Sequence, residues 1–178
     1  RFHVQTAGSA LTAQSIDNNV VRAAYQALAA VLGGAQSLHV NGKDEALALP
    51  TEESARLALR TQQVLAHEAG VAGTVDPLGG SWAIEALTDT IESEVLALIA
   101  ETDRLGGAVA AISAGFPQRA IQDAAFAYQR DVEGGTRVIV GVNQFVDEAV
   151  TTPPIARIDP AREREQVASL KSFRASRD

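Results

Sequence analysis

Polar side chains in two short segments are spaced so that they could bind one ligand. Both segments alternate polar and apolar residues, as a strand with one polar face does, so His3 shares a face with Gln5 and His39 shares a face with Asn41. Glu45 follows Asn41 by four residues, and a helical turn there would bring its carboxylate near the amide. Such groups suit hydrogen bonds to sugar hydroxyls and amides. They form no nucleophile–base triad, so we expect no catalytic residue among them.

Two interpretations of this pattern stay open on the residues alone. Ligands in α/β folds bind at the carboxyl ends of parallel strands, and a polar face on an otherwise buried strand is costly unless it has partners. A ligand site made from His3, Gln5, Asn41 and Glu45 satisfies both points. Coincidence combined with hydrogen bonds inside the core would produce the same residues.

The elements that would place these side chains form a crossover unit. We expect a strand at residues 1–6, an alanine-rich helix at 20–32 that ends at Gly33-Gly34, and a second strand around His39. A strand, helix and strand in this order favour parallel pairing. Thr51 is the expected cap of the next helix, which has two acidic residues in its first turn.

The later elements are less regular. We expect a third strand at 71–76, a long helix capped by Ser81, a helix opened by Pro117 and a short strand at 137–142. The two helices should bury apolar stripes at a spacing of about 3.6 residues. The expected buried residues are Ile84, Leu87, Ile91, Val95 and Leu98 in the first helix, and Ile121, Ala124, Ala125, Tyr128 and Val132 in the second. Residues 151–154 resemble a linker, and an exposed helix near 161–172 should lie on a partner.

Composition excludes several classes of function. The chain has 178 residues, of which 46% are hydrophobic, which suits a globular core. A net charge of −7 argues against a nucleic-acid partner, and the absence of cysteine excludes disulfides and thiolate nucleophiles. No apolar run approaches the roughly 18 residues that a membrane span needs, and no signal peptide precedes the first strand, so we expect a cytoplasmic protein. Because the chain lacks methionine and opens in mid-strand, we interpret it as part of a longer protein.

Common catalytic and metal motifs are also missing. The sequence has no Gly-x-Gly-x-x-Gly, phosphate-binding loop, Gly-x-Ser-x-Gly or His-Glu-x-x-His, and its three histidines lack metal spacing, so no metal ligand is predicted. The stretch from His67 to Gly70 is similar to part of the Asp-x-His-x-x-Gly motif that ligates cobalt in some vitamin B12 domains. Residue 65 is Leu, however, and we interpret His67 as a surface histidine.

Longer matches extend over nearly the whole chain. They include His3-Val-Gln-Thr6, Gln36-Ser-Leu-His39, Asp44-Glu-Ala-Leu47, Val75-Asp-Pro-Leu-Gly-Gly-Ser81, Val138-Ile-Val-Gly-Val-Asn143 and Lys171-Ser-Phe-Arg-Ala-Ser-Arg-Asp178. In these motifs the chain resembles the large, catalytic subunit of the methylmalonyl-CoA mutase family of adenosylcobalamin-dependent acyl-CoA mutases. The resemblance implies an α/β fold: the C-terminal portion of a TIM (β/α)8 barrel at 1–148 with a helical elaboration, and an extended C-terminal linker at 149–178 toward a B12-binding domain.

The resemblance also implies roles for particular residues. Asn41 and Glu45 match positions that bind the adenosyl ribose, Gln5 and Gly8 match positions that touch the corrin, and His3 lies beside them. A small apolar surface under the corrin is implied for three further residues, Ala46, Ala48 and Leu49. Ordinary helix packing is the alternative explanation for Ala46 and Ala48.

Substrate and partners follow from the same resemblance. Family members rearrange an acyl-CoA by radical chemistry, and a B12-binding domain or small subunit and assembly into a dimer or heterotetramer are implied. Ser9-Ala10 replaces the Trp-Ser of methylmalonyl-type members, so the chain is more similar to isobutyryl-CoA or 2-hydroxyisobutyryl-CoA mutases. The alternative is a non-catalytic module of the same fold that docks a cobalamin protein or acts like a chaperone.

Overall fold

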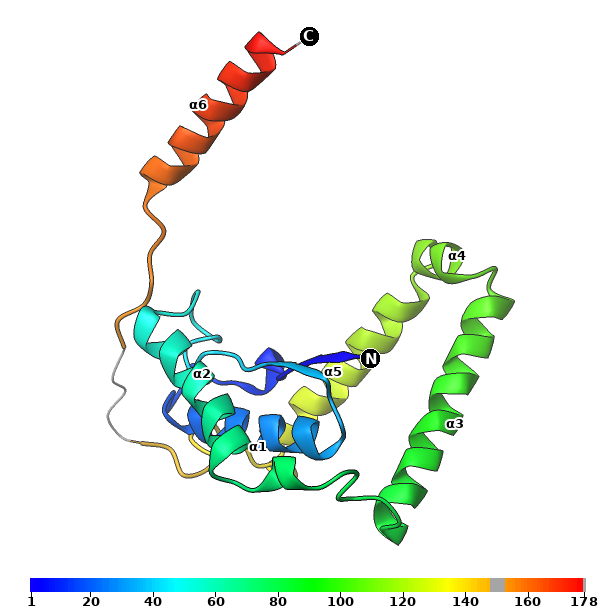
Figure 1. The fold of residues 1–178 in the computed structure, drawn as a ribbon. Helices are drawn as coiled ribbons and strands as arrows, with labels where there is room; N and C mark the ends of the chain where they lie inside the picture. Colours follow the sequence, from blue (N-terminus) through cyan, green and yellow to red (C-terminus); the bar gives the residue numbers. More distant parts are fainter. Residues whose placement is uncertain (148–152, 178) are drawn as a thin grey trace.

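Helices make up most of the fold. The structure, a computed structural model, describes residues 1–147 and 153–177 (Figure 1). In chain order the elements are β1 (His3–Gln5), the 3-10 turn η1 (Gly8–Ala10), α1 (Asn18–Leu32), β2 (Ser37–His39), α2 (Glu52–His67), the 3-10 turn η2 (Val71–Gly73), α3 (Trp82–Arg104), α4 (Ala108–Ser113), α5 (Phe116–Glu133) and α6 (Pro160–Ser176). No helix among the described residues is long and apolar enough to cross a membrane.

The expected crossover unit is present. Strands β1 and β2 pair in parallel, with Val4 opposite Leu38 and Gln5 opposite His39. Each strand exposes its first and third residues and half-buries the middle one, which is the alternation that the sequence predicted. Helix α1 connects the two strands, and its alanine-rich sequence ends at Gly33 and Gly34 as expected.

The core around this unit is small and rich in alanine. It contains Ala23 and Ala27 from α1, Val40 after β2 and Ala58 from α2, with Leu38 packed against them. Alanine side chains allow two helices to approach closely because little volume separates their backbones. Helix α2 begins at the predicted cap, since the Thr51 side chain accepts a hydrogen bond from the backbone N–H of Ser54.

A buried asparagine connects three segments near this core. The side chain of Asn19 is fully buried. Its Oδ1 accepts from Thr12 N at 3.1 Å and from Arg22 Nη1 at 2.7 Å, and its Nδ2 donates to the carbonyls of Thr12 and Lys43, each at 2.8 Å. This amide therefore holds the loop before α1 against the loop that follows β2.

Two strand predictions were wrong. Residues 71–76 contain η2 instead of a third strand, after Gly70 adopts a left-handed conformation. Within 137–142 the structure has only one isolated bridge, from Val140 to Gln144. The side chain of Asn143 accepts from Ile139 N and donates to the Arg137 carbonyl, so it occupies backbone groups that a neighbouring strand would otherwise pair.

The segment at 137–147 instead packs against the start of α1. Arg22 Nη2 donates to the carbonyl of Val140 at 2.6 Å, and Ser15 Oγ donates to Asp147 Oδ2 at 2.8 Å. Gly141 has a φ of 80° and lies so close that a Cβ there would be 2.7 Å from Ser15 Oγ. Only glycine fits this left-handed position at such a close approach.

The predicted stripes of α3 and α5 are not buried. Both helices form where expected, but Ile84 is 37% exposed, Leu98 is 57% exposed and Ile121 is 67% exposed. Figure 1 shows the reason, since α3 stands away from α1 and α2 and connects through α4 to α5. Periodicity predicts which face of a helix is apolar, but burial of that face needs an element that the described residues do not supply.

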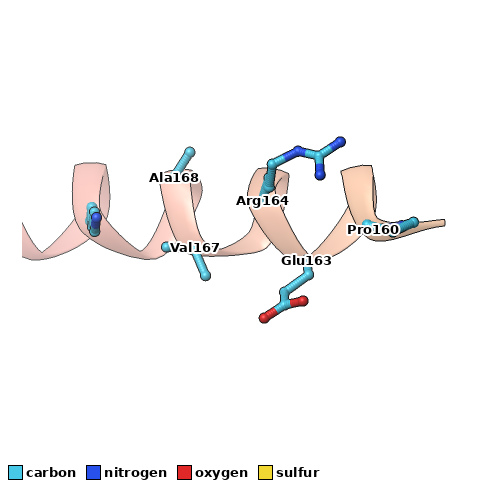
Figure 2. Close-up of a pocket in the computed structure, with 6 residues that line it drawn as sticks. Pro160, Glu163, Arg164, Val167 and Ala168 are labelled. Atoms are coloured by element: carbon cyan, nitrogen blue, oxygen red, sulfur yellow. The ribbon is translucent and has the colours of Figure 1, made fainter. Parts of the chain in front are cut away.

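Helix α6 is exposed, as predicted, and extends from the rest of the structure after an extended segment at 153–159 (Figure 1). Asp159 caps it by accepting from Ala161 N at 2.8 Å. A shallow hollow runs along its surface between Pro160 and Lys171, and Figure 2 shows Glu163 and Arg164 pointing to opposite sides of the helix there. Because this hollow lies along one helix alone, we do not consider it a ligand site. The expected boundary between 148 and 149 lies outside the described residues.

Replacement of Asn19 should destabilise the full-length protein strongly. Asn19→Ala removes four hydrogen bonds and leaves part-buried backbone groups of Thr12 and Lys43 without this partner, so the free energy of unfolding should fall by about 2–3 kcal/mol. Urea unfolding measures this change. Asn18→Ala, in the same helical turn, is the matched control and should cost about 0.5 kcal/mol or less. Equal effects of the two substitutions would contradict the role of Asn19.

Candidate functional site

Gln5 and Asn41 join the carboxyl ends of the two strands through their side chains. Gln5 Nε2 donates to Asn41 Oδ1 at 3.0 Å. Asn41 in turn donates twice to Thr6: its Nδ2 to the Thr6 carbonyl and its backbone N–H to Thr6 Oγ1, each at 2.9 Å. Thr6 is 4% exposed and Asn41 is 3% exposed, while Gln5 remains exposed on the strand face. The expected convergence of these two amides is therefore present.

Gly8 and Glu45 complete the cluster. A Cβ added to Gly8 would lie 3.2 Å from Asn41 Nδ2, 3.3 Å from Glu45 Cγ and 3.4 Å from Glu45 Oε1. The absence of a side chain at Gly8 therefore allows the glycine backbone to lie against both residues. Glu45 is exposed, and a hydrogen bond from its N–H to the carbonyl of Gly42 places it in the turn that the sequence predicted.

The other predicted site residues lie at the margins of this cluster. His3 is on the same face of β1 as Gln5, but its Nδ1 lies 2.9 Å from Ser37 Oγ, across the start of the sheet. Ala46 and Leu49 are exposed and Ala48 is half-buried, all in the turn after Glu45. Since this stretch is a turn rather than a regular helix and leaves Ala46 exposed, packing within a helix does not account for that residue.

Asp44 anchors the turn that carries Glu45. Its Oδ1 accepts from Ser54 Oγ at 2.6 Å and its Oδ2 accepts from Thr51 N at 2.9 Å. Burial by itself would raise the pKa of the Asp44 carboxyl, but the hydrogen bonds from Ser54 and Thr51 outweigh burial and hold the pKa below its ordinary value. Gly42 leaves room for this arrangement, since a Cβ there would be 2.7 Å from Asp44 Oδ1.

Sequence reasoning did not assign roles to Thr6 and Asp44. Thr6 directly follows the alternating residues of β1. A threonine at the end of a strand was the sequence signal for a hydrogen bond at that end. Asp44 lies seven residues before Thr51, and only the folded loop brings its carboxylate to the start of α2. His39, which shares the polar face of its strand with Asn41, lies opposite Gln5 in the parallel register, on the exposed face of the sheet.

The cluster has hydrogen-bond acceptors, and exposed apolar residues follow it in the same turn. The Glu45 carboxylate has two oxygens available for donors, and Ala46 and Leu49 lie exposed beside it in sequence. Among residues 1–147 and 153–177 no group of histidine and acidic side chains could hold a metal ion. The arrangement therefore suits binding and orientation of a ligand rather than proton transfer by a triad.

Comparison with known proteins assigns the chain to a class. The family model described as methylmalonyl-CoA mutase matches residues 1–178, so the chain belongs to the methylmalonyl-CoA mutase family. The resemblance inferred from the sequence motifs is thereby confirmed.

The relatives are named for two different acyl-CoA substrates. Methylmalonyl-CoA mutase of Escherichia coli (strain K12) is 48% identical over all of this chain and 25% of its own length. The 2-hydroxyisobutanoyl-CoA mutase large subunit of Aquincola tertiaricarbonis is 44% identical over all of this chain and 32% of its own length. Mitochondrial methylmalonyl-CoA mutase of Homo sapiens is 42% identical over all of this chain and 24% of its own length. The chain thus spans about a quarter to a third of the relatives it matches.

The Asp44 anchor should make stability depend on pH. A carboxyl group whose pKa is lowered by folding contributes stability above its unfolded pKa of about 4, and this contribution is lost as the pH falls through the folded pKa. Asp44→Asn should therefore lower the free energy of unfolding by about 1–3 kcal/mol near pH 7, with a difference from the wild type that shrinks below about pH 4.

Urea unfolding of both proteins between pH 7 and pH 3 tests this expectation. Asp89→Asn, at an exposed position in α3, is the matched control and should change the free energy of unfolding by about 0.5 kcal/mol or less. A difference between wild type and Asp44→Asn that stays constant over the whole pH range would show that the charge of Asp44 does not stabilise the turn.

Proposed function

We propose that this chain is part of the catalytic subunit of an adenosylcobalamin-dependent acyl-CoA mutase. The observation that carries the proposal is the convergence of Gln5, Gly8, Asn41 and Glu45 at the carboxyl ends of β1 and β2. Membership in the methylmalonyl-CoA mutase family over residues 1–178 supports it. A parallel strand–helix–strand unit with ligand groups at this end is also what a (β/α)8 barrel repeats.

The residues present fit such a cofactor. The missing side chain of Gly8 leaves room for the side chains of Asn41 and Glu45 at the site, and Ala46, Ala48 and Leu49 are small or apolar residues that follow Glu45 in sequence. A carboxylate can accept hydrogen bonds from both hydroxyls of a ribose. When bound, adenosylcobalamin would supply homolysis of its cobalt–carbon bond, which starts radical rearrangement of the substrate.

The chain's own residues would hold and orient this group. In the proposed arrangement Glu45 accepts from the ribose hydroxyls, and Asn41 contributes at most the second hydrogen of its Nδ2, because the first donates to Thr6. Gln5 and Gly8 would contact the corrin, and His3 lies on the same face of β1 as Gln5. The apolar residues of the turn would exclude water from the bound cofactor.

The larger organisation is proposed on the same basis. Residues 1–148 would be the C-terminal part of the barrel domain with its helical elaboration. Residues 149–178 would be an arm toward a B12-binding domain or small subunit, and the exposure of α6 supports a role in contacting such a partner. Assembly into a dimer or heterotetramer is expected for the whole protein.

The proposed substrate is a branched acyl-CoA that is converted to its linear isomer. Relatives named for methylmalonyl-CoA and for 2-hydroxyisobutanoyl-CoA have similar identities of 48% and 44%, so overall identity does not favour either. Ser9 and Ala10 form part of η1 and are both exposed. Their small side chains favour the isobutyryl-CoA or 2-hydroxyisobutyryl-CoA type over the methylmalonyl type.

Removal of the Glu45 carboxylate should damage the activity severely. In the full-length protein with its B12-binding partner and adenosylcobalamin, Glu45→Ala should lower turnover of a branched acyl-CoA about 100-fold or more, because two hydrogen bonds to a charged acceptor are lost. Conversion to the linear isomer is measured by chromatography of the acyl-CoA products.

Glu68→Ala, at the exposed end of α2, is the matched control and should leave turnover unchanged. Unchanged turnover in Glu45→Ala would refute the assignment of the site. Cobalamin binding by the wild type without isomerisation of any branched acyl-CoA would instead select the alternative function, a docking or chaperone-like module.

A side chain at Gly8 should weaken cofactor binding. The added methyl group of Gly8→Ala would lie within 3.2–3.4 Å of Asn41 and Glu45, so Glu45 must move. We expect the Kd for adenosylcobalamin to rise about fivefold, as for other overpacked sites that cost about 1 kcal/mol. Absorbance titration measures this Kd. Gly73→Ala is the control because a Cβ there meets nothing within 4 Å, and equal effects of both substitutions would argue against close packing at Gly8.

A further inference from the structure

We propose that Asn41 is a positioning residue that fixes the direction of the Gln5 side-chain amide, so that Gln5 presents its Oε1 to the ligand. This inference rests on the proposed function for the ligand's identity, but the orientation itself follows from hydrogen bonds within the chain. It specifies which chemical groups this end of the site can recognise.

The hydrogen bonds that fix these side-chain orientations start at the backbone of Thr6. Its carbonyl oxygen can only accept, and it lies 2.9 Å from the terminal amide of Asn41. The nitrogen of that amide must therefore face Thr6, because the reverse orientation would place two oxygens 2.9 Å apart. A second hydrogen bond, from Asn41 N to Thr6 Oγ1, holds the backbone of Asn41 in place.

The direction of Gln5 follows from the direction of Asn41. With its nitrogen turned toward Thr6, Asn41 turns Oδ1 toward Gln5 at a distance of 3.0 Å. Only the nitrogen of Gln5 can donate to that oxygen, so Oε1 of Gln5 points elsewhere. Within the described part of the chain no donor bonds to this Oε1. The Gln5 amide thus has one orientation, and its acceptor is available to a ligand.

Burial explains why the constraint originates with Asn41 and not with Gln5. Asn41 is 3% exposed and Thr6 is 4% exposed, so water cannot replace the bonds between them. Gln5 is exposed, and an amide at the surface would otherwise rotate freely. The buried amide of Asn41 therefore determines the direction in which the exposed amide of Gln5 points.

This orientation defines the ligand chemistry. Gln5 Oε1 and the carboxylate of Glu45 are both acceptors, so this end of the cluster favours groups that donate, such as hydroxyls and primary amides. Phosphate and carboxylate groups are disfavoured, because their oxygens are acceptors too and cannot donate to Gln5 Oε1 or to the Glu45 carboxylate. The sugar hydroxyls and peripheral amides of a cobalamin meet this requirement.

Four full-length proteins test whether Asn41 orients the Gln5 amide, an effect that we call the relay: the wild type, Gln5→Glu, Asn41→Leu and the double variant. Glutamate has an oxygen at both terminal positions and so presents an acceptor without needing orientation. In the wild-type background, however, it places an oxygen against Asn41 Oδ1. The Kd for adenosylcobalamin is measured by absorbance titration, and the free energy of unfolding of each apo protein is measured in urea.

We expect Gln5→Glu to weaken cobalamin binding about tenfold when Asn41 is present and to strengthen it severalfold in the Asn41→Leu background, where the clash is absent. Any general effect of the extra charge occurs in both backgrounds, so the comparison cancels it. If Asn41 contacted only the ligand and did not orient Gln5, the effects of the two substitutions on the free energy of cobalamin binding would add. Equal weakening by Gln5→Glu in both backgrounds would overturn the proposal.

Two further measurements keep the outcomes distinct. If the wild type binds no cobalamin, the proposed function fails, but unfolding of the four apo proteins still tests the relay, and additive stabilities there would overturn it. If Asn41→Leu does not fold, Gln5→Met decides, since it keeps the length of Gln5 without an acceptor. Its Kd should rise about tenfold, and an unchanged Kd would contradict the role of Oε1.

Discussion

The buried hydrogen bonds between Thr6 and Asn41 are the constraint on which the site depends. The two short parallel strands that the structure describes share a small ladder, so hydrogen bonds beyond the strands help to hold its carboxyl end. The carbonyl and hydroxyl of Thr6 close that end by accepting from the side chain and backbone of Asn41. Because both residues are almost fully buried, these bonds do not compete with water, and they hold the Asn41 amide against which Gln5 and Gly8 lie.

Buried polar side chains support the rest of the site in a similar way. Asn19 fixes the carbonyl of Lys43 and Asp44 accepts from the start of α2, so the turn with Glu45 is held at two successive residues. This arrangement compensates for a thin apolar core, in which alanine is the main residue type. Such a network is specific because every donor faces an acceptor, and it is sensitive because losing one partner leaves another group unpaired.

Local signals predicted the elements that position the site, whereas signals that depend on distant partners failed. Alternation in 1–6 and 37–41, the glycines at 33–34 and the cap at Thr51 are all satisfied within a few residues, and the structure agrees with them. The strand expected at 137–142 was wrong because the side chain of Asn143 binds the backbone that a strand would pair. The stripe on α3 was correctly placed on the helix but is exposed, since no described element covers it. Residue patterns brought Gln5, Asn41 and Glu45 together and indicated sugar hydroxyls and amides as ligand groups, but only the family resemblance implied a cobalamin.

The alanine contact between α1 and α2 has a consequence for variants of this protein. Ala27 is fully buried and Ala58 nearly so, directly beneath Val40 and the loop that follows it. A larger side chain at Ala27 would displace the neighbouring helix, and the small void beside Ala58 is too small to take one without a shift of the neighbouring loop. Loss-of-function variants at these positions would then mimic ligand-site lesions, although neither alanine belongs to the ligand cluster. Genetic screens that map defects in this region by proximity to ligand alone would misassign them.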